Sequence, residues 1–177
     1  MPLRTYFDFA ENDYLYFMAS CERGDVANMM GAIAQGICEK YMKHLIEEFD
    51  QPVNEDEVSQ KEKALHSHSL NRLLKHIQAR LGVDFSTETK KEMRIIDGFY
   101  FSTRYPGDES IELSREDVED CCAAVQSCRK ETLEWIERLS VKDKPMTLEE
   151  KIEAARIVFE AQDDSIDHVF KEEQERG

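Results

Sequence analysis

The sequence predicts an all-α protein: an irregular up-and-down helical bundle of about five helices, followed by an additional C-terminal helix. Three observations predict this class. Only 7 Gly and 4 Pro occur among 177 residues, so few residues break helices. Apolar residues repeat every three or four positions through most of the chain, which is the spacing of a helix with one buried face. Hydrophobic residues make up 41% of the chain, which is sufficient for a core in a domain of this length.

The first two helices are predicted within residues 8–49. Residues 8–22 carry apolar side chains at helical spacing, and Gly24 ends this helix. The second helix is expected to begin near residue 25 and to continue to residue 49 as the strongest period of the chain. Its predicted buried stripe is Val26, Met30, Ile33, Ile37, Tyr41 and Leu45. Gly31 and Gly36 within it are interpreted as points of close approach by a neighbouring helix.

A connection and two further helices are predicted over residues 50–100. Residues 50–62 are acidic and contain Pro52, so we expect a mobile connection there. A third helix follows over residues 70–81, with a leucine-rich stripe and Gly82 as its stop. A fourth is expected from Ser86 or Thr87 through Tyr100, ending before Pro106.

The last two predicted helices lie after residue 113. Ser114 and Asp117 resemble a helix start, and a long apolar stripe then continues to Leu139. Thr147 with Glu150 is a capping-box signature for the C-terminal helix. From Thr147 onward the chain has ten acidic and four basic residues, so this helix is acidic and amphipathic, and its apolar face needs the bundle or another subunit. We therefore expect a bundle over residues 1–140 and a linker with this helix over residues 141–177.

Charge and apolar content limit the partners. The formal net charge of −15 weighs against binding to a polyanion over the whole surface, although a local basic face is compatible with it. The apolar runs are too short to span a membrane, and the N-terminal residues lack the pattern of a signal peptide. The sequence thus predicts a cytoplasmic protein without membrane contact.

The five cysteines are interpreted as small core residues. Cys121, Cys122 and Cys128 fall within one predicted helix, where adjacent residues point in different directions. A disulfide or a thiolate metal site is not expected there.

One segment resembles a site more than a packing element. Thr103–Asp108 places Arg104 beside an aromatic-Pro-Gly turn. A guanidinium binds phosphate or carboxylate through paired donors, and Tyr105 can stack on a base or another aromatic ring. In the alternative interpretation Tyr105 packs into the bundle and Arg104 pairs with Asp108 or another acid.

A basic stripe is the second candidate. His68, Arg72, His76 and Arg80 recur at steps of four and therefore share one helix face. With lysines of the second helix they could bind an anion, whereas the alternative is a solvated face. His66 and His68 are two residues apart and diverge on a helix, so no metal site is expected. The candidate ligand-binding residues are Arg104, Tyr105, His68, Arg72, His76, Lys40 and Lys43, with no catalytic residue, no metal ligand and no cofactor.

Three motifs in this order resemble the HEPN superfamily of small helical domains. Gln35, Glu39, Lys40 and Lys43 are similar to its Gln-x-x-x-Glu-Lys-x-x-Lys pattern, and His68 through Leu73 to its His-x-Leu-x-x-Leu helix start. Residues 103–106 are similar to its Thr-Arg-Tyr-Pro turn. The resemblance covers roughly residues 8–139.

The resemblance implies a helical bundle that is commonly a homodimer. Some family members are ribonucleases acting through Arg-x(4–6)-His, and others pair with minimal nucleotidyltransferases, bind nucleotides or assist partner proteins. No His follows Arg104 within residues 105–111. The expected function is therefore a non-catalytic binding or partner module, with a nucleotide or RNA, or a nucleotidyltransferase, as its partner.

Two other functions remain open at this point. The first is a divergent metal-independent ribonuclease in which His68 or His76 supplies the missing base. The second is a structural interaction protein whose acidic helix from Thr147 docks on another chain.

Overall fold

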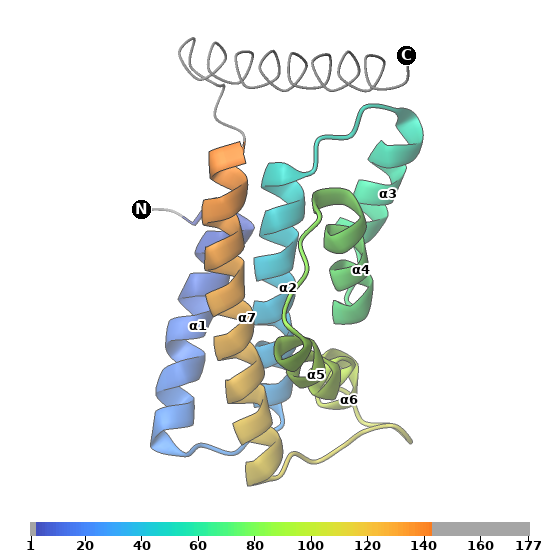
Figure 1. Ribbon diagram of the computed structural model, residues 1–177. Helices are drawn as coiled ribbons and strands as arrows, with labels where there is room; N and C mark the ends of the chain where they lie inside the picture. The colour runs from blue at the N-terminus through green and yellow to red at the C-terminus, as the bar shows by residue number, and fades with distance from the viewer. Residues whose placement is uncertain (1–2, 143–177) are drawn as a thin grey trace, which may run out of the picture. The chain divides into compact units, whose positions relative to one another are not determined.

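Helix α2 (Met29–Phe49) is the centre of the fold, and each of the other described helices contacts it (Figure 1). The computed structural model describes residues 3–142. Its other helices are α1 (Tyr6–Arg23), α3 (Glu55–Leu65), α4 (Leu70–Leu81), α5 (Thr87–Ile96), α6 (Phe99–Ser102) and α7 (Arg115–Lys142). No strand occurs in this part of the chain, which confirms the all-α bundle. The predicted helix from Thr147 and the proposed 141–177 segment lie outside the described residues, apart from the end of α7. None of the described helices is both long enough and apolar enough to cross a bilayer.

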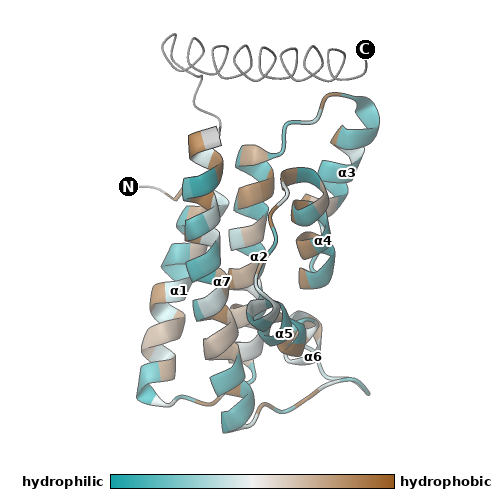
Figure 2. Cartoon of the chain, viewed as in Figure 1, coloured by the Kyte–Doolittle hydropathy of each residue, from teal (hydrophilic) through white to brown (hydrophobic). Residues whose placement is uncertain are grey.

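The core forms where the apolar stripes of the helices meet. Ile37, Tyr41 and Leu45 of α2 have no exposed surface, and Leu73 of α4 is equally buried. In Figure 2 the apolar positions of α4 lie on the side that faces α2. Helix α7 joins the same core, because the Cys38 Sγ lies 3.9 Å from the carbonyl oxygen of Ala124. The predicted helical periods therefore identified most of the buried faces.

Capping residues set the ends of α1 and α4. Helix α1 begins with a capping box between Thr5 and Asp8, slightly before the predicted start, and ends at the predicted Gly24, whose φ is 72°. Helix α4 begins after Ser69, whose hydroxyl accepts from the Arg72 amide, and ends at the predicted Gly82 with φ 67°. The apolar stripe over residues 70–81 is therefore helical as predicted, but His68, which the predicted basic stripe placed on this helix, lies before it.

Helix α2 begins later than predicted. Val26 lies before it and is 44% exposed. The Asn28 side chain does not cap α2; its amide donates to the Ile111 carbonyl at 2.9 Å and its oxygen accepts from the Leu113 amide at 3.0 Å. Asn28 thus holds residues 111–113, which lead into α7, against the start of α2.

The prediction of a mobile connection over residues 50–62 was wrong, because α3 occupies most of it. Asn54 caps α3 by accepting from the Glu57 amide at 2.9 Å. Acidic residues fill the first turn of α3, where they interact favourably with the helix dipole. The Lys61 ammonium also donates to the carbonyls of Glu47 and Asp50, at 3.1 and 2.7 Å, and so attaches α3 to the end of α2.

The single helix predicted through Tyr100 is two helices. Helix α5 ends at Ile96 and α6 begins at Phe99, because Gly98 has φ 113°. Residues other than glycine rarely adopt that conformation. The chain turns there and directs α6 toward α2.

The interpretation of all five cysteines as core residues was also wrong for two of them. Cys21 of α1 and Cys122 of α7 form a disulfide with an S–S distance of 2.07 Å. The divergence of neighbouring side chains on α7 excludes a Cys121–Cys122 bond but not a bond to another helix. The other three, Cys38, Cys121 and Cys128, are free and buried. Burial raises the pKa of the Cys121 thiol to about 12, so it is protonated at neutral pH.

The two glycines of α2 have different roles. A Cβ on Gly31 would lie 3.0 Å from side-chain atoms of Leu113, Phe99 and Thr103. A Cβ on Gly36 would meet only the Lys40 Nζ, at 3.6 Å. The close-approach interpretation is therefore confirmed for Gly31 and wrong for Gly36.

Alanine substitutions at these glycines should change stability in opposite directions. Gly36→Ala should raise the free energy of unfolding by up to about 1 kcal/mol, because alanine restricts the unfolded chain and fits the helix. Gly31→Ala should lower it by about 1–3 kcal/mol through overpacking. Urea unfolding followed by circular dichroism measures both changes, and equal effects of the two substitutions would contradict the assignment.

Loss of the disulfide should destabilise the bundle. The bond joins residues 101 positions apart, so a Cys21→Ser/Cys122→Ser variant should lose about 2–4 kcal/mol of unfolding free energy. Reductant should lower the melting temperature of the natural sequence but not that of the variant. Titration of the denatured, unreduced protein should find three free thiols; five would show that the bond is absent.

Candidate functional site

The Thr103–Asp108 turn follows α6 directly and is held by that helix. The Thr103 amide and hydroxyl both donate to the Phe99 carbonyl, at 3.1 and 2.6 Å. The Ile111 amide donates to the Ser102 carbonyl at 3.0 Å and folds the chain back against α6. Thr103 is buried, whereas Arg104 is exposed. The turn therefore presents its arginine outward from a fixed base.

Arg104 lies over aromatic rings and not beside an acid. Its Cζ is 4.8 Å from the centre of the Tyr100 ring and 5.5 Å from that of Tyr105. Within residues 3–142 no carboxylate forms an ion pair with it. Tyr105 is 55% exposed. The alternative of a packed Tyr105 and an Arg104–Asp108 pair is not what the structure contains.

An aromatic cluster forms the floor beneath Arg104. The His68 and Tyr100 rings stack with centres 4.7 Å apart and planes 8° apart. The Phe101 ring stands edge-on to both, with centres 6.0 Å from His68 and 5.0 Å from Tyr100. Phe101 is 56% exposed. His68 and Arg104 thus contact the same ring, although 36 positions separate them in the sequence.

Buried polar side chains of α2 position this cluster. The Gln35 Oε1 accepts from the amides of Gly98 and Tyr100, at 3.1 and 2.7 Å. Its Nε2 donates to the His68 carbonyl at 2.5 Å. One turn later, the Glu39 Oε2 lies 3.1 Å from the His68 Nδ1 and 3.4 Å from the Lys43 Nζ. The motif at residues 35–43 is therefore a buried network that holds His68 and α6 together.

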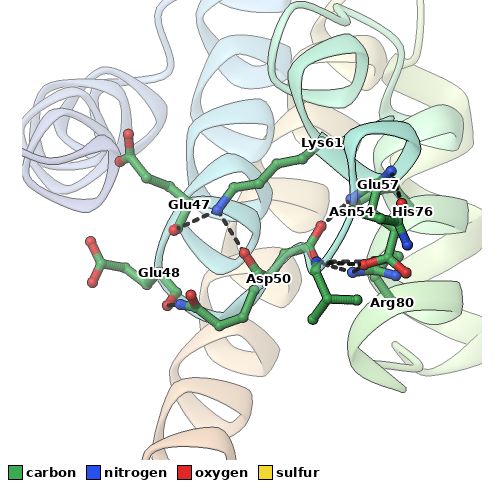
Figure 3. Close-up of polar contacts among 10 residues, drawn as sticks. Glu47, Glu48, Asp50, Asn54, Glu57, Lys61, His76 and Arg80 are labelled. Carbon is green, nitrogen blue, oxygen red and sulfur yellow. Dashed lines mark hydrogen bonds and ion pairs between the residues drawn. The ribbon is translucent and has the colours of Figure 1, made fainter. Parts of the chain in front are cut away.

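The prediction that His68, Arg72, His76 and Arg80 share one helix face was wrong for His68, which lies before α4. His76 and Arg80 contact the Asp50 carboxylate at 2.8 and 3.0 Å, and Arg80 also contacts Glu57 at 2.8 Å (Figure 3). Asp50 is 2% exposed. The Arg80 hydrogen bond lowers the pKa of Glu57. His76 thus belongs to a packing network between α2, α3 and α4, away from the aromatic cluster that holds His68.

The candidate lysines of α2 face acids of the bundle. The Lys40 Nζ lies 2.7 Å from the Asp13 carboxylate of α1. Lys43 is 7% exposed and directed at Glu39. Arg72, in contrast, is exposed and lines a hollow beside the cluster. The structure therefore brings together Arg104, Tyr105 and His68, with Arg72 nearby, and places the other candidates elsewhere.

Three adjoining hollows surround α6 and the turn. The first, about 490 Å³, is lined by residues that include His68, Arg72 and Phe101. The second, about 390 Å³, lies between Phe101 and Tyr105. The third, about 520 Å³, contains Arg104 together with Glu112. Exposed rings and a guanidinium along open hollows are suited to a ligand with a flat ring and an anionic group.

No group of three or more His, Cys, Asp or Glu side chains within residues 3–142 could hold a metal ion. The His66 Nδ1 lies 2.8 Å from the Glu62 carbonyl and is occupied there.

The comparison with protein families decides the family. The model of the HEPN domain matches residues 58–139. This part of the chain belongs to the HEPN family. The matched range contains the His68 motif and the Arg104 turn of this HEPN domain, whereas the Gln35 motif precedes it. No curated protein and no solved structure matches the chain.

Sequence reasoning missed two aromatic residues of the HEPN site. Tyr100 was assigned to the stripe of a predicted helix, where aromatic residues ordinarily pack, and Phe101 was given no role. The aromatic run Phe99-Tyr100-Phe101 directly after an Asp-Gly pair was the available signal, since Asp-Gly marks turns.

Loss of the Gln35 amide should destabilise the site and the bundle together. Gln35→Ala leaves the partly buried hydrogen bonds of the Gly98 and Tyr100 amides without their acceptor, so the unfolding free energy should fall by about 1–3 kcal/mol. Gln78→Ala, at an exposed position of α4, is the matched control and should change it by less than about 0.5 kcal/mol. Urea unfolding measures both. Similar losses in the two variants would show that Gln35 does not hold α6.

Proposed function

We propose that this HEPN domain is a non-catalytic module that binds a nucleotide through Arg104. The observation that supports this proposal is the exposed guanidinium held over Tyr100 and Tyr105 without an acidic partner among the described residues. The ring contacts orient the guanidinium and leave its N–H donors available for a phosphate. The exposed face of Tyr105 offers a stacking surface for a base.

The remaining lining of the Arg104 hollow suits the sugar of a nucleotide. Glu112 lines this hollow and Glu109 lines the adjoining one. Carboxylates accept hydrogen bonds from hydroxyl groups, so they suit ribose and oppose a second negative charge. A nucleoside monophosphate therefore fits the charges better than a triphosphate does.

Nucleotide binding should depend on Arg104. Calorimetric titration with AMP should detect binding to the natural sequence, and Arg104→Ala should weaken it about tenfold to a hundredfold, as expected for loss of a charge-assisted contact. Arg138→Ala is a matched control, because Arg138 also lies over an aromatic ring, 4.9 Å from the centre of Trp135. It should bind AMP like the natural sequence. Absence of binding, or equal losses in both variants, would refute the proposal.

A second candidate function is metal-independent RNA cleavage, and one observation favours it. His68 contacts the same ring as Arg104, and its Nδ1 faces Glu39. If Nδ1 donates to Glu39, Nε2 is left as an acceptor and can serve as a general base. Cleavage of an RNA oligonucleotide in EDTA that is lost in Arg104→Ala and His68→Ala, and kept in His76→Ala, would establish this function in place of simple binding.

The assembly expected from the family is part of the proposal. The family resemblance implies a dimer, and we propose a homodimer that acts in the cytoplasm. A minimal nucleotidyltransferase is the proposed partner protein. The interaction-protein alternative rests on the segment from Thr147, which lies outside the described residues.

A further inference from the structure

A fourth hollow lies between α3 and α4, beyond the site already described. Its volume is about 250 Å³. Its lining residues are Gln60, Lys63, Ala64, Ser67, Arg72 and His76. His76 is already paired with the buried Asp50. Lys63 and Arg72 are the two cations of this lining that the packing does not use.

Both cations are exposed and lack acidic partners within residues 3–142. Carboxylates of the bundle pair with other cations, such as Lys40, Arg80 and Arg129. No such pair includes Lys63 or Arg72. In a chain of net charge −15, two unpaired cations on one hollow form a local site for an anion.

Helix stability does not account for the position of Arg72. It is in the first turn of α4, directly after Leu70 and Asn71. A cation there faces the positive end of the helix dipole, which is unfavourable. The Asp97 carboxylate accepts from the amides of Leu70 and Asn71, at 2.9 and 3.1 Å, so it is engaged with the backbone and not with Arg72.

The hollows form a continuous series. The one at Lys63 shares Ser67 and Arg72 with the next hollow. That hollow shares Phe101 with the hollow between Phe101 and Tyr105, which in turn shares Tyr105 with the hollow of Arg104. Cations therefore lie at both ends of the series, and exposed aromatic rings lie between them. Phosphates alternating with stackable bases have the same order of chemical groups.

We propose that Lys63 and Arg72 form a second phosphate subsite, and that the ligand is a single-stranded oligonucleotide of at least two linked nucleotides. This inference rests on the proposed function, because Arg104 holds the first phosphate. A base stacks on Phe101 between the two subsites. A mononucleotide reaches the Arg104 end alone.

Dependence of affinity on ligand length tests the second subsite. Deoxyadenosine 5′-monophosphate and its 5′-phosphorylated tetramer are titrated into the full chain; the deoxy sugar prevents cleavage through a 2′-hydroxyl. The natural sequence should bind the tetramer at least about tenfold more tightly, as expected for one added charge-assisted contact. In Lys63→Ala/Arg72→Ala the ratio of the two affinities should fall to near one. Lys75→Ala/Lys91→Ala, which removes two exposed charges outside the four hollows, should preserve the ratio.

The outcomes separate the two proposals. A tetramer that binds no more tightly than the monomer, with both lost in Arg104→Ala, would overturn the second subsite and leave the proposed function standing. An equal fall of the ratio in both double variants would also overturn it, since net charge alone would then explain the effect. If neither ligand binds the natural sequence, the nucleotide proposal itself fails, and the second subsite fails with it.

Discussion

The arrangement of the site depends on one buried side chain, the amide of Gln35. It accepts from Gly98 and Tyr100, 63 and 65 positions away, and donates to the His68 carbonyl, 33 positions away. Gln35 is 1% exposed, so water cannot replace these bonds without cost. A single residue of α2 thus fixes the backbone on both sides of the His68–Tyr100 stack. Glu39, one turn further, orients the imidazole, and the position of Arg104 follows from that of Tyr100.

The ion pairs between helices show which charged side chains remain exposed. Acids on one helix neutralise cations on another, as in the contacts of Glu11 with Arg129 and of Asp50 with Arg80, which are 118 and 30 positions apart. These pairs leave Arg72 and Arg104 exposed beside aromatic rings. An overall charge of −15 correctly argues against a uniformly basic surface, but it does not determine where unpaired cations remain.

The sequence was a sufficient guide to the fold wherever local signals decide it. Periodic apolar residues and glycine stops located α1, α4 and most of α2, because burial of one face and the helix caps are local properties. Helix α3 was not predicted, because the acidic residues and Pro52 of residues 50–62 indicated a mobile connection. The signal for a helix was Asn54, a capping residue, followed by three acids. The Cys21–Cys122 bond joins different helices, and spacing within α7 contains no information about α1.

Only the part of the site that depends on local sequence was predictable. Arg104 and Tyr105 were predicted because both belong to one turn. His68 and His76 were assigned to one helix stripe, but His68 lies before the Ser69 cap of α4 and stacks on Tyr100, whereas His76 lies within α4 and binds Asp50. The spacing of four alone did not show that the helix begins after His68. Tyr100 was assigned to packing because its role depends on Gln35, a contact between distant positions.

The fold of the turn explains why the missing histidine matters for function. In the family pattern the His would stand at residue 109, 110 or 111 of this chain. The Ile111–Ser102 hydrogen bond still returns this segment to α6, and Glu109 and Ser110 line the same hollow as Tyr105. The backbone therefore folds these positions back toward the turn, and the residues that occupy them carry a carboxylate, a hydroxyl and an alkyl group. Glu109 and Ser110 can hydrogen-bond to the hydroxyl groups of a bound sugar, and no imidazole stands in this part of the turn, which is consistent with the proposal of binding.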